Sequence, residues 1–133
     1  MLSQILDRQL LLKALGACNK SLKASAPDFY ALLIFDGDNL GKLLQRPEFD
    51  NEKISLALAT FTRGVDRIVT KHSGVTMYAG GDDVLALLPI TTAIECATAL
   101  RTAYGESATR HLPADQAAEM TASAAIVFAH FHL

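Results

Sequence analysis

Four acidic side chains stand at two turns of this sequence and could hold metal ions together. Asp36 and Asp38 belong to the stretch FDGDN, and Asp82 and Asp83 follow two glycines in AGGDD. Carboxylates that converge repel one another unless cations lie among them. Their oxygen atoms suit Mg²⁺ or Mn²⁺, and two such ions about 3.5–4 Å apart can support phosphoryl or nucleotidyl transfer. We expect Asp36, Asp82 and Asp83 to be metal ligands, with Asp82 and Asp83 as the catalytic pair.

The residues around these aspartates suit an anionic phosphate. In the stretch DGDNLGK, an aspartate or asparagine could cap a short helix, whose free backbone N–H groups would face the phosphate. A lysine one turn inside that helix adds a positive charge, and the two glycines of GGDD let a nucleotide approach their turn closely. The residues expected to bind the nucleotide are Gly37, Asp38, Asn39, Lys42, Gly80 and Gly81.

Each motif also has a simpler explanation. Gly-Gly-Asp is common in hairpin turns, and DGDN is common as a turn or a helix cap. The combination of both motifs beside adjacent strands, with a lysine in the first helix, favours a metal site. His130 and His132 share one face of the last expected strand and could bind metal, but no third ligand stands near them. Arg63 and Arg101 fit exposed helix faces, although either could reach a triphosphate.

Hydrophobic spacing predicts the elements that must position these motifs. FYALLIF, residues 29–35, is a wholly apolar run typical of a strand buried on both faces. The following LGKLLQR predicts one or two helical turns closed by Pro47. Apolar residues at steps of three and four predict an amphipathic helix over residues 51–71. VTMYA and VLALLP predict a hairpin with GGDD at its tip.

The last third of the chain predicts a helix and a final strand. Thr92 and Glu95 form a T-x-x-E capping box for a helix that should end near Tyr104, with Gly105 closing it. ATRHLPADQAAEM then indicates a polar connection, and TASAAIVFAHFH a strand. This order predicts an α+β fold of ferredoxin-like or palm type, an antiparallel sheet with helices on one face. In such a layer the exit of the first strand lies next to the GGDD tip.

Length and composition are those of an ordinary globular protein. We expect residues 1–24 to form an N-terminal amphipathic helix and residues 25–133 one domain. Cys18 and Cys96 form no CxxC pair and are expected to be buried thiols. A net charge of -2 gives no sign of non-specific nucleic-acid or membrane binding. No apolar run is long enough to span a membrane, so we expect a cytoplasmic protein.

Three blocks of the sequence resemble one known family. YALLIFDGDNLGKLL, GVTMYAGGDDVLALLP and TASAAIVFAHFH occur in the order found in the GGDD-bearing palm domain of the large subunit of type III CRISPR effector complexes, most closely the III-B (Cmr) kind. The resemblance covers roughly residues 28–133. It implies a palm like those of nucleotide cyclases and polymerases, working with other subunits and guide RNA. On target RNA binding, the complex would convert ATP with Mg²⁺ or Mn²⁺ into cyclic oligoadenylates that activate defence effectors.

The resemblance also implies roles for particular residues and a limit to them. Asp82 and Asp83 would be metal ligands, with Asp36 as a further ligand, while Gly80, Gly81, Lys42 and the Gly37 backbone would border the triphosphate. Family members add an HD domain, a first palm, a zinc-binding region and a C-terminal helical domain, and their nucleotides lie between two palms. We therefore expect a C-terminally truncated fragment that binds metal and nucleotide as half a site and is not an independent cyclase.

Two other functions remain open at this point. FDGDN followed by GGDD loosely mirrors the surroundings of GGDEF motifs, so a diguanylate cyclase that uses GTP as a homodimer is one alternative. The other is a non-catalytic, truncated palm that acts as an interaction module, an idea favoured by Leu11 and Leu15 of the first helix, which have no obvious place in so small a domain.

Overall fold

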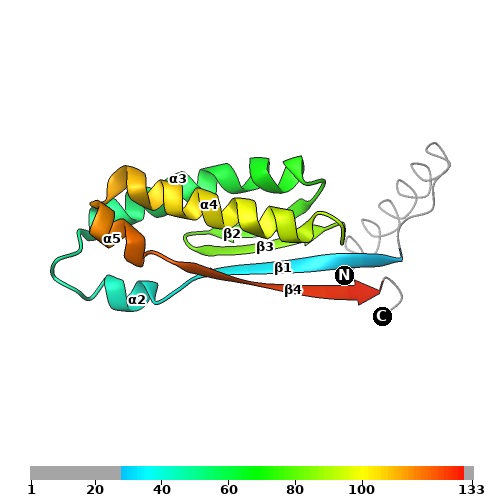
Figure 1. Ribbon diagram of the computed structural model, residues 1–133, viewed down its shortest axis with the longest axis horizontal. Helices are drawn as coiled ribbons and strands as arrows, with labels where there is room; N and C mark the ends of the chain where they lie inside the picture. Colours follow the sequence, from blue (N-terminus) through cyan, green and yellow to red (C-terminus); the bar gives the residue numbers. More distant parts are fainter. Residues whose placement is uncertain (1–27, 131–133) are drawn as a thin grey trace, which may run out of the picture.

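Four antiparallel strands form the centre of the fold. The computed structural model describes residues 28–130, and its strands are β1 (Phe29–Gly37), β2 (Val75–Gly80), β3 (Asp83–Leu88) and β4 (Ala122–His130). Their order in the sheet is β2-β3-β1-β4, with β1 paired to both β3 and β4 (Figure 1). The predicted α+β fold with an antiparallel sheet is confirmed.

Two long helices cover one face of this sheet. The helices are α2 (Leu40–Leu43), α3 (Asn51–Lys71), α4 (Ala93–His111) and α5 (Ala114–Glu119). Figure 1 shows α3 and α4 lying together on the same side of the strands, while α2 and α5 lie at the end where β1 leaves the sheet. The helix predicted over residues 51–71 is confirmed. It begins where the Asp50 side chain accepts hydrogen bonds from the backbone N–H groups of Glu52 (3.0 Å) and Lys53 (3.3 Å).

The core between sheet and helices contains an aromatic cluster. Phe35 of β1, Phe61 of α3 and Tyr104 of α4 are all almost fully buried. Their ring centroids lie 5.2 to 5.9 Å apart, and Tyr104 meets both phenylalanines edge to face. Such offset and edge-on pairs add stability beyond the buried area. The cluster therefore fixes the three elements against one another directly behind the exit of β1.

The other face of the sheet carries no helix within residues 28–130. Along β1, Leu33 and Phe35 are buried, whereas Ile34 between them is 44% exposed. The expectation that this strand is buried on both faces is therefore wrong, because only one of its faces is covered by helices. Directly paired residues of neighbouring strands point to the same face, which places Leu32 with Leu87 and Val127 on the uncovered face. We call this surface the open face.

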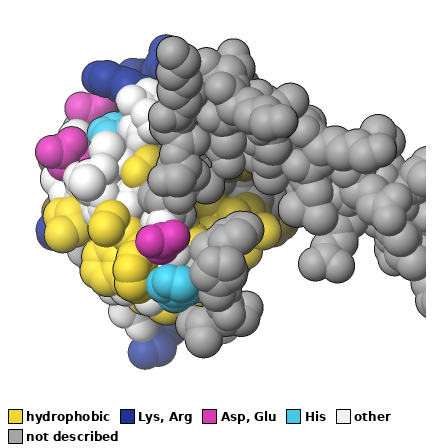
Figure 2. Space-filling view, turned by 90° about the vertical axis from the view of Figure 1, so that its right-hand side faces the viewer, with side chains coloured by type: hydrophobic (Ala, Val, Ile, Leu, Met, Phe, Trp, Pro, Cys, Tyr) yellow, Lys and Arg dark blue, Asp and Glu magenta, His cyan; other side chains and the backbone are white. Residues whose placement is uncertain are grey.

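Hydrophobic side chains also stay exposed at the end of the molecule where β1 begins. Figure 2 looks at this end and shows hydrophobic side chains gathered around one acidic and one histidine side chain. The exposed large hydrophobic residues at the ends of the elements that meet here are Phe29, Tyr30, Val75, Ile90, Ile94 and Phe128. This end is chemically unlike the opposite one, where the aspartates lie.

The helix predicted to end near Tyr104 continues to His111 instead. Gly105 lies inside it, and a Cβ added there would meet nothing within 4 Å, so the glycine closes nothing. A glycine inside a helix costs about 1 kcal/mol relative to alanine, but burial of Ser107 and Ala108 on the following turn continues the packed face. The predicted polar connection is also wrong in part, because α5 forms within it.

The predicted capping box is wrong as well. The Thr92 side chain makes no cap hydrogen bond to α4. Its hydroxyl donates instead to the carbonyl oxygen of His72, at 2.7 Å, and so ties the start of α4 to the end of α3. A long-range partner has replaced the local one.

Several expectations fall on residues outside the described range of 28–130. These are the N-terminal helix over residues 1–24, the thiol of Cys18 and the side chain of His132. The helices within the described range are too short or too polar to cross a membrane.

Candidate metal and nucleotide site

The exit of β1 and the tip of the hairpin lie side by side. The antiparallel register pairs Phe35 with Val84, and continuing it by one residue brings Asp36 opposite Asp83. Within the hairpin, Asp83 pairs with Gly80. The sheet order therefore brings together the two acidic motifs, 46 residues apart in the chain, as the sequence predicted.

Asp36 and Asp83 meet on the open face. The interaction with Asp83, a hydrogen bond that forms when one of the two carboxyl groups is protonated, is the largest cause that raises the pKa of Asp36 above its usual range. Desolvation and repulsion by Asp83 and Asp38 raise this pKa further, while a hydrogen bond with the Gly37 backbone lowers it. Two carboxyl groups in contact hold a proton more tightly than one alone. A divalent cation between them would relieve the repulsion that raises this pKa.

Asp82 lies on the helix-covered side of the tip rather than with this pair. A Cβ added to Gly37 would lie 2.7 Å from both Cβ and Oδ2 of Asp82, and 2.7 Å from the Tyr104 hydroxyl. Asp82 belongs to the turn, whereas Asp83 is the first residue of β3, so their side chains lie on different sides of the tip. Burial is the largest cause that raises the pKa of Tyr104, followed by the negative charges of Asp82, Asp38 and Asp36.

Asp38 is held by the start of β4. Its carboxylate accepts hydrogen bonds from the hydroxyls of Thr121 (2.9 Å) and Ser123 (2.7 Å), and its backbone N–H donates to the Thr121 carbonyl (2.8 Å). The two hydroxyls, and then the charge of Arg101, lower the pKa of Asp38 below its usual value. The expectation that Asp38 caps the short helix is therefore wrong, because its carboxylate is engaged across the sheet.

Helix α2 carries the remaining expected phosphate-binding residues but is only four residues long. Asn39 precedes it in a left-handed conformation (φ 57°) and makes no side-chain cap hydrogen bond, so the alternative cap prediction is also wrong. Lys42 is exposed in the last turn of this helix. Its predicted contact with phosphate stays a prediction.

The two glycines of the tip have different neighbours. Gly81 adopts φ +63°, a backbone conformation that side chains disfavour. Its carbonyl accepts a hydrogen bond from the Thr62 hydroxyl of α3, at 3.0 Å. A Cβ on Gly80 would lie 2.5 Å from the Tyr78 hydroxyl. The backbone conformation therefore favours glycine at position 81, whereas a Cβ at position 80 would require the exposed Tyr78 ring to shift.

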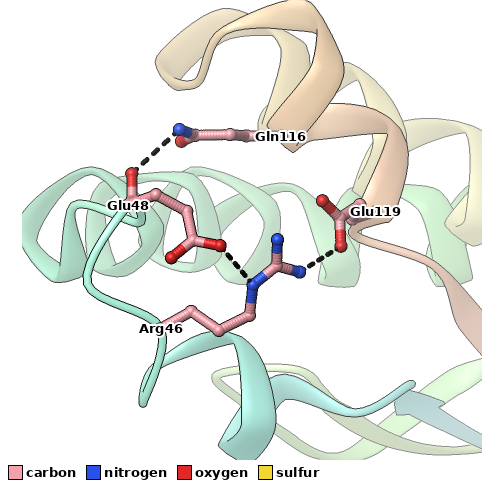
Figure 3. A network of polar contacts seen from close by, with 4 residues as sticks. All are labelled: Arg46, Glu48, Gln116 and Glu119. Carbon is pink, nitrogen blue, oxygen red and sulfur yellow. Dashed lines mark hydrogen bonds and ion pairs between the residues drawn. The ribbon is translucent and has the colours of Figure 1, made fainter.

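A polar network holds the segment after α2 against α5. The Arg46 guanidinium binds the carboxylates of Glu48 (2.7 Å) and Glu119, and the Gln116 side-chain amide donates to the Glu48 carbonyl at 2.9 Å (Figure 3). Exposed ion pairs such as these contribute little to stability one by one. Their geometric effect is to connect α2, which follows the DGDN turn, with the helix that precedes β4.

The carboxylate pair fits a Mg²⁺ or Mn²⁺ ion by its chemistry. Within residues 28–130 no three His, Cys, Asp or Glu side chains lie close enough to hold a metal by themselves. Mg²⁺ commonly uses only one or two carboxylates and completes its octahedron with water and substrate phosphates. Asp36 and Asp83 supply such a pair, and Asp82 lies just across the turn.

The remaining candidates, two histidines, a cysteine and two arginines, are not part of the carboxylate pair. The His130 ring packs edge to face on Phe29, at 4.8 Å, and Cys96 is fully buried, which raises the pKa of its thiol to about 11. The His72 ring lies 2.8 Å from the Ile68 carbonyl at the end of α3. Arg63 and Arg101 are both exposed.

Sequence reasoning missed three residues that shape this site. Tyr104 follows Cys96 and Leu100 at four-residue steps, a spacing that indicates only a core position. Thr121 and Ser123 stand at the start of the last strand, far from Asp38 in the chain. No local pattern could have found them, because their contacts come from strand pairing and helix packing.

The family was decided by comparison with known proteins. Residues 29–133 match the family described as Cas10/Cmr2, second palm domain. The chain is also 34% identical over 120 residues to the CRISPR system Cmr subunit Cmr2 of Pyrococcus furiosus, an alignment that covers 70% of this chain and 14% of that protein. This chain belongs to the Cas10/Cmr2 palm family. It spans about one seventh of the length of its curated relative, so this Cmr2-type palm corresponds to one part of a much larger subunit.

Solved structures with the same fold are nucleotide cyclases. A bacterial light-regulated adenylyl cyclase superposes with a TM-score of 0.60 at 12% identity, over 96% of this chain and 44% of that one. The guanylyl cyclase Cya2 gives 0.58 at 16% identity, over 76% and 54%. The GGEEF domain of a diguanylate cyclase from Vibrio cholerae gives 0.57 at 19% identity, over 90% and 72%. At these identities the likeness establishes the fold, a palm like that of nucleotide cyclases.

Proposed function

We propose that this palm binds ATP together with Mg²⁺ or Mn²⁺ and serves as a nucleotidyltransferase half-site in a type III CRISPR effector complex. The strand register that brings Asp36 opposite Asp83 is the observation that supports this most directly. An unneutralised carboxylate pair at the exit of a central strand is costly without a cation. In our proposal Asp36 and Asp83 hold one metal ion on the open face, and Asp82, on the other side of the turn, is a ligand of the second ion of a two-metal site.

The bound metal would neutralise the triphosphate and lower the barrier to attack by a hydroxyl, which loses its proton, on the α-phosphorus, from which pyrophosphate leaves. In our proposal the Gly37 backbone and the two tip glycines border the triphosphate, and Lys42 adds positive charge on α2. In the complete complex, with guide RNA and bound target RNA, the product would be a cyclic oligoadenylate. These assignments rest on membership in the Cas10/Cmr2 family and on the name of the Pyrococcus relative as a subunit of a CRISPR system.

The open face supports the half-site character of the proposal. Asp36 and Asp83 lie at one end of this face, and the apolar side chains of Ile34 and Val127 lie further along it, 44% and 50% exposed. Exposed apolar surface of this kind marks contact with another protein surface. In our proposal a second palm covers the open face and encloses the nucleotide, and the isolated chain binds ATP without cyclising it.

The test is isothermal titration of the 133-residue chain with non-hydrolysable ATP and GTP analogues, with Mn²⁺ present or withheld. We expect Mn²⁺-dependent ATP binding that disappears in the double variant Asp82→Ala, Asp83→Ala while circular dichroism shows the fold intact. In the reconstituted complex the same variant should abolish ATP turnover. Product formation by that variant would overturn the proposal.

A diguanylate-cyclase-like function is the second candidate, favoured by the similarity to the GGEEF domain. It requires GTP and a homodimer whose two half-sites face each other. Preference for the GTP analogue, with dimerisation in analytical ultracentrifugation, would select it over the ATP-dependent function. Absence of binding to either nucleotide would leave a non-catalytic interaction module.

A further inference from the structure

Tyr104 stands behind the acidic site in a fixed position. Only 3% of the residue is exposed, and its ring is held edge to face by Phe35, at 5.9 Å, and by Phe61, at 5.2 Å. Because the ring cannot tilt without disturbing both neighbours, the direction of its hydroxyl is set by the core. Packing of this kind is what holds a polar group in one place for a functional site.

The Tyr104 hydroxyl and the Asp82 carboxylate meet over Gly37. Both the hydroxyl oxygen and Asp82 Oδ2 lie 2.7 Å from the point where a Gly37 Cβ would stand. The distance between the two oxygens is therefore at most twice 2.7 Å. One water molecule can bridge such a distance. Any side chain at Gly37 would occupy the space between them.

The Tyr104 hydroxyl and the Asp82 carboxylate have no other polar partner in the part of the chain that the structure describes. No hydrogen bond or ion pair within residues 28–130 involves the Asp82 carboxylate or the Tyr104 hydroxyl. Tyr104 also borders a hollow of about 370 Å³ between α4, α5 and β4, which it lines together with Arg101 and Thr121. Water can therefore reach this side of the tyrosine.

We propose that Tyr104 is a positioning residue whose hydroxyl donates a hydrogen bond, through one bridging water, to the Asp82 carboxylate. This inference rests on the proposed function, in which Asp82 is a metal ligand. A carboxylate at the end of a turn rotates freely and loses that freedom when it binds a cation. A donor fixed by the core orients one oxygen in advance and leaves the other to the metal, as outer-shell partners do in other metal sites.

The experiment compares Tyr104→Phe with Tyr30→Phe in the full 133-residue chain. Phenylalanine keeps the ring in the aromatic cluster and removes only the hydroxyl. Tyr30 lies at the opposite end of β1, so its variant controls for the loss of a tyrosine hydroxyl. Isothermal titration should give a Mn²⁺ dissociation constant about 10-fold weaker for Tyr104→Phe, in line with the 10–100-fold cost of losing an outer-shell partner. Wild-type affinity in Tyr104→Phe would overturn the positioning role.

A double-variant cycle separates positioning from a general loss of structure. Tyr104→Phe and Asp82→Asn should be non-additive in Mn²⁺ affinity, because the hydroxyl acts only through this carboxylate. Tyr104→Phe combined with Asp36→Asn should be additive. Additivity in the first pair would contradict the inference even if Tyr104→Phe alone binds Mn²⁺ weakly.

A metal-free measurement keeps this inference distinct from the proposed function. The chain has three tyrosines and no tryptophan, so its near-ultraviolet circular dichroism reports on tyrosines. Asp82→Asn should change this band in the presence of a chelator, and the change should be absent in the Tyr104→Phe background. That result without any Mn²⁺ binding by the wild type would overturn the proposed function and support the pairing. Mn²⁺ binding without this spectral coupling would support the proposed function and overturn the pairing of Tyr104 with Asp82.

Discussion

Asp36 and Asp38 leave β1 only two residues apart, yet their surroundings are opposite. Asp36 meets another carboxyl group, that of Asp83, and its pKa is raised. Asp38 meets the hydroxyls of Thr121 and Ser123, and its pKa is lowered. For Asp36 the like-charged neighbour thus outweighs the one backbone hydrogen bond that favours its ionised form, whereas Asp38 has two hydroxyl donors and the charge of Arg101.

The difference separates a residue available for chemistry from one that holds the fold together. A carboxylate with matched donors is stable as it is and joins β1 to β4 where the sheet ends. A carboxylate that faces a like charge is stabilised only by a proton or a cation, and such strain is typical of binding sites. The GGDD side of the β1 exit is therefore the side to test for metal.

The largest expected effect is on metal binding, and it should distinguish the two aspartates. Asp36→Asn should weaken Mn²⁺-dependent binding of the ATP analogue by roughly 100-fold or more, since loss of a direct ligand exceeds the 10–100-fold cost of an outer-shell partner. Asp38→Asn is the matched control and should weaken it by less than about 10-fold. Isothermal titration of both variants measures this. Equal losses would mean that the comparison between the two carboxylates is wrong.

The next effect is on the pH dependence of stability without metal. A raised pKa in the folded state means that Asp36 contributes stability at low pH that is lost as the pH rises through its folded pKa. A lowered pKa means that Asp38 contributes stability at neutral pH that is lost as the pH falls through its folded pKa. In a chelator at neutral pH, Asp36→Asn should thus raise the unfolding temperature and Asp38→Asn should lower it.

Thermal unfolding followed by circular dichroism, between about pH 3 and pH 7, checks both signs. The Asp36→Asn variant should lose the decline in stability that this residue causes as pH rises. A lower unfolding temperature for Asp36→Asn at neutral pH would show that its contact with Asp83 is stabilising, against our interpretation.

The smallest expected effect is on the free energy of unfolding, and it compares a glycine of the GGDD turn with a glycine inside α4. Gly81→Ala should destabilise the chain by about 1–2 kcal/mol, because φ +63° is unfavourable for a residue with a Cβ. Gly105→Ala should stabilise it by about 1 kcal/mol, since this helical glycine has open space where the Cβ would lie. Urea unfolding measures both free energies. Opposite signs are expected, and destabilisation by Gly105→Ala would indicate that a glycine is needed inside α4.

Much of the fold could be predicted because its signals are local. The three- and four-residue steps of α3 and the GGDD turn both arise from neighbours in the chain. The limit of such signals is visible at Thr92, whose T-x-x-E pattern suggested a cap while its hydroxyl bonds to His72 instead. Local patterns compete with tertiary partners, and the sequence does not show which of them prevails.

The sequence by itself determined which chemical groups this palm contains and that two acidic motifs would meet, since antiparallel order follows from the succession of strands and helices. Only the tertiary structure decided which neighbours each of the four aspartates has. The start of β3 places Asp83 beside Asp36 on the open face, and the turn places Asp82 near Gly37 and Tyr104. Because β1 pairs with β4, the Asp38 carboxylate accepts hydrogen bonds from Thr121 and Ser123 at the start of β4. Distances between residues remote in the chain depend on packing, and packing assigned each carboxylate its partner.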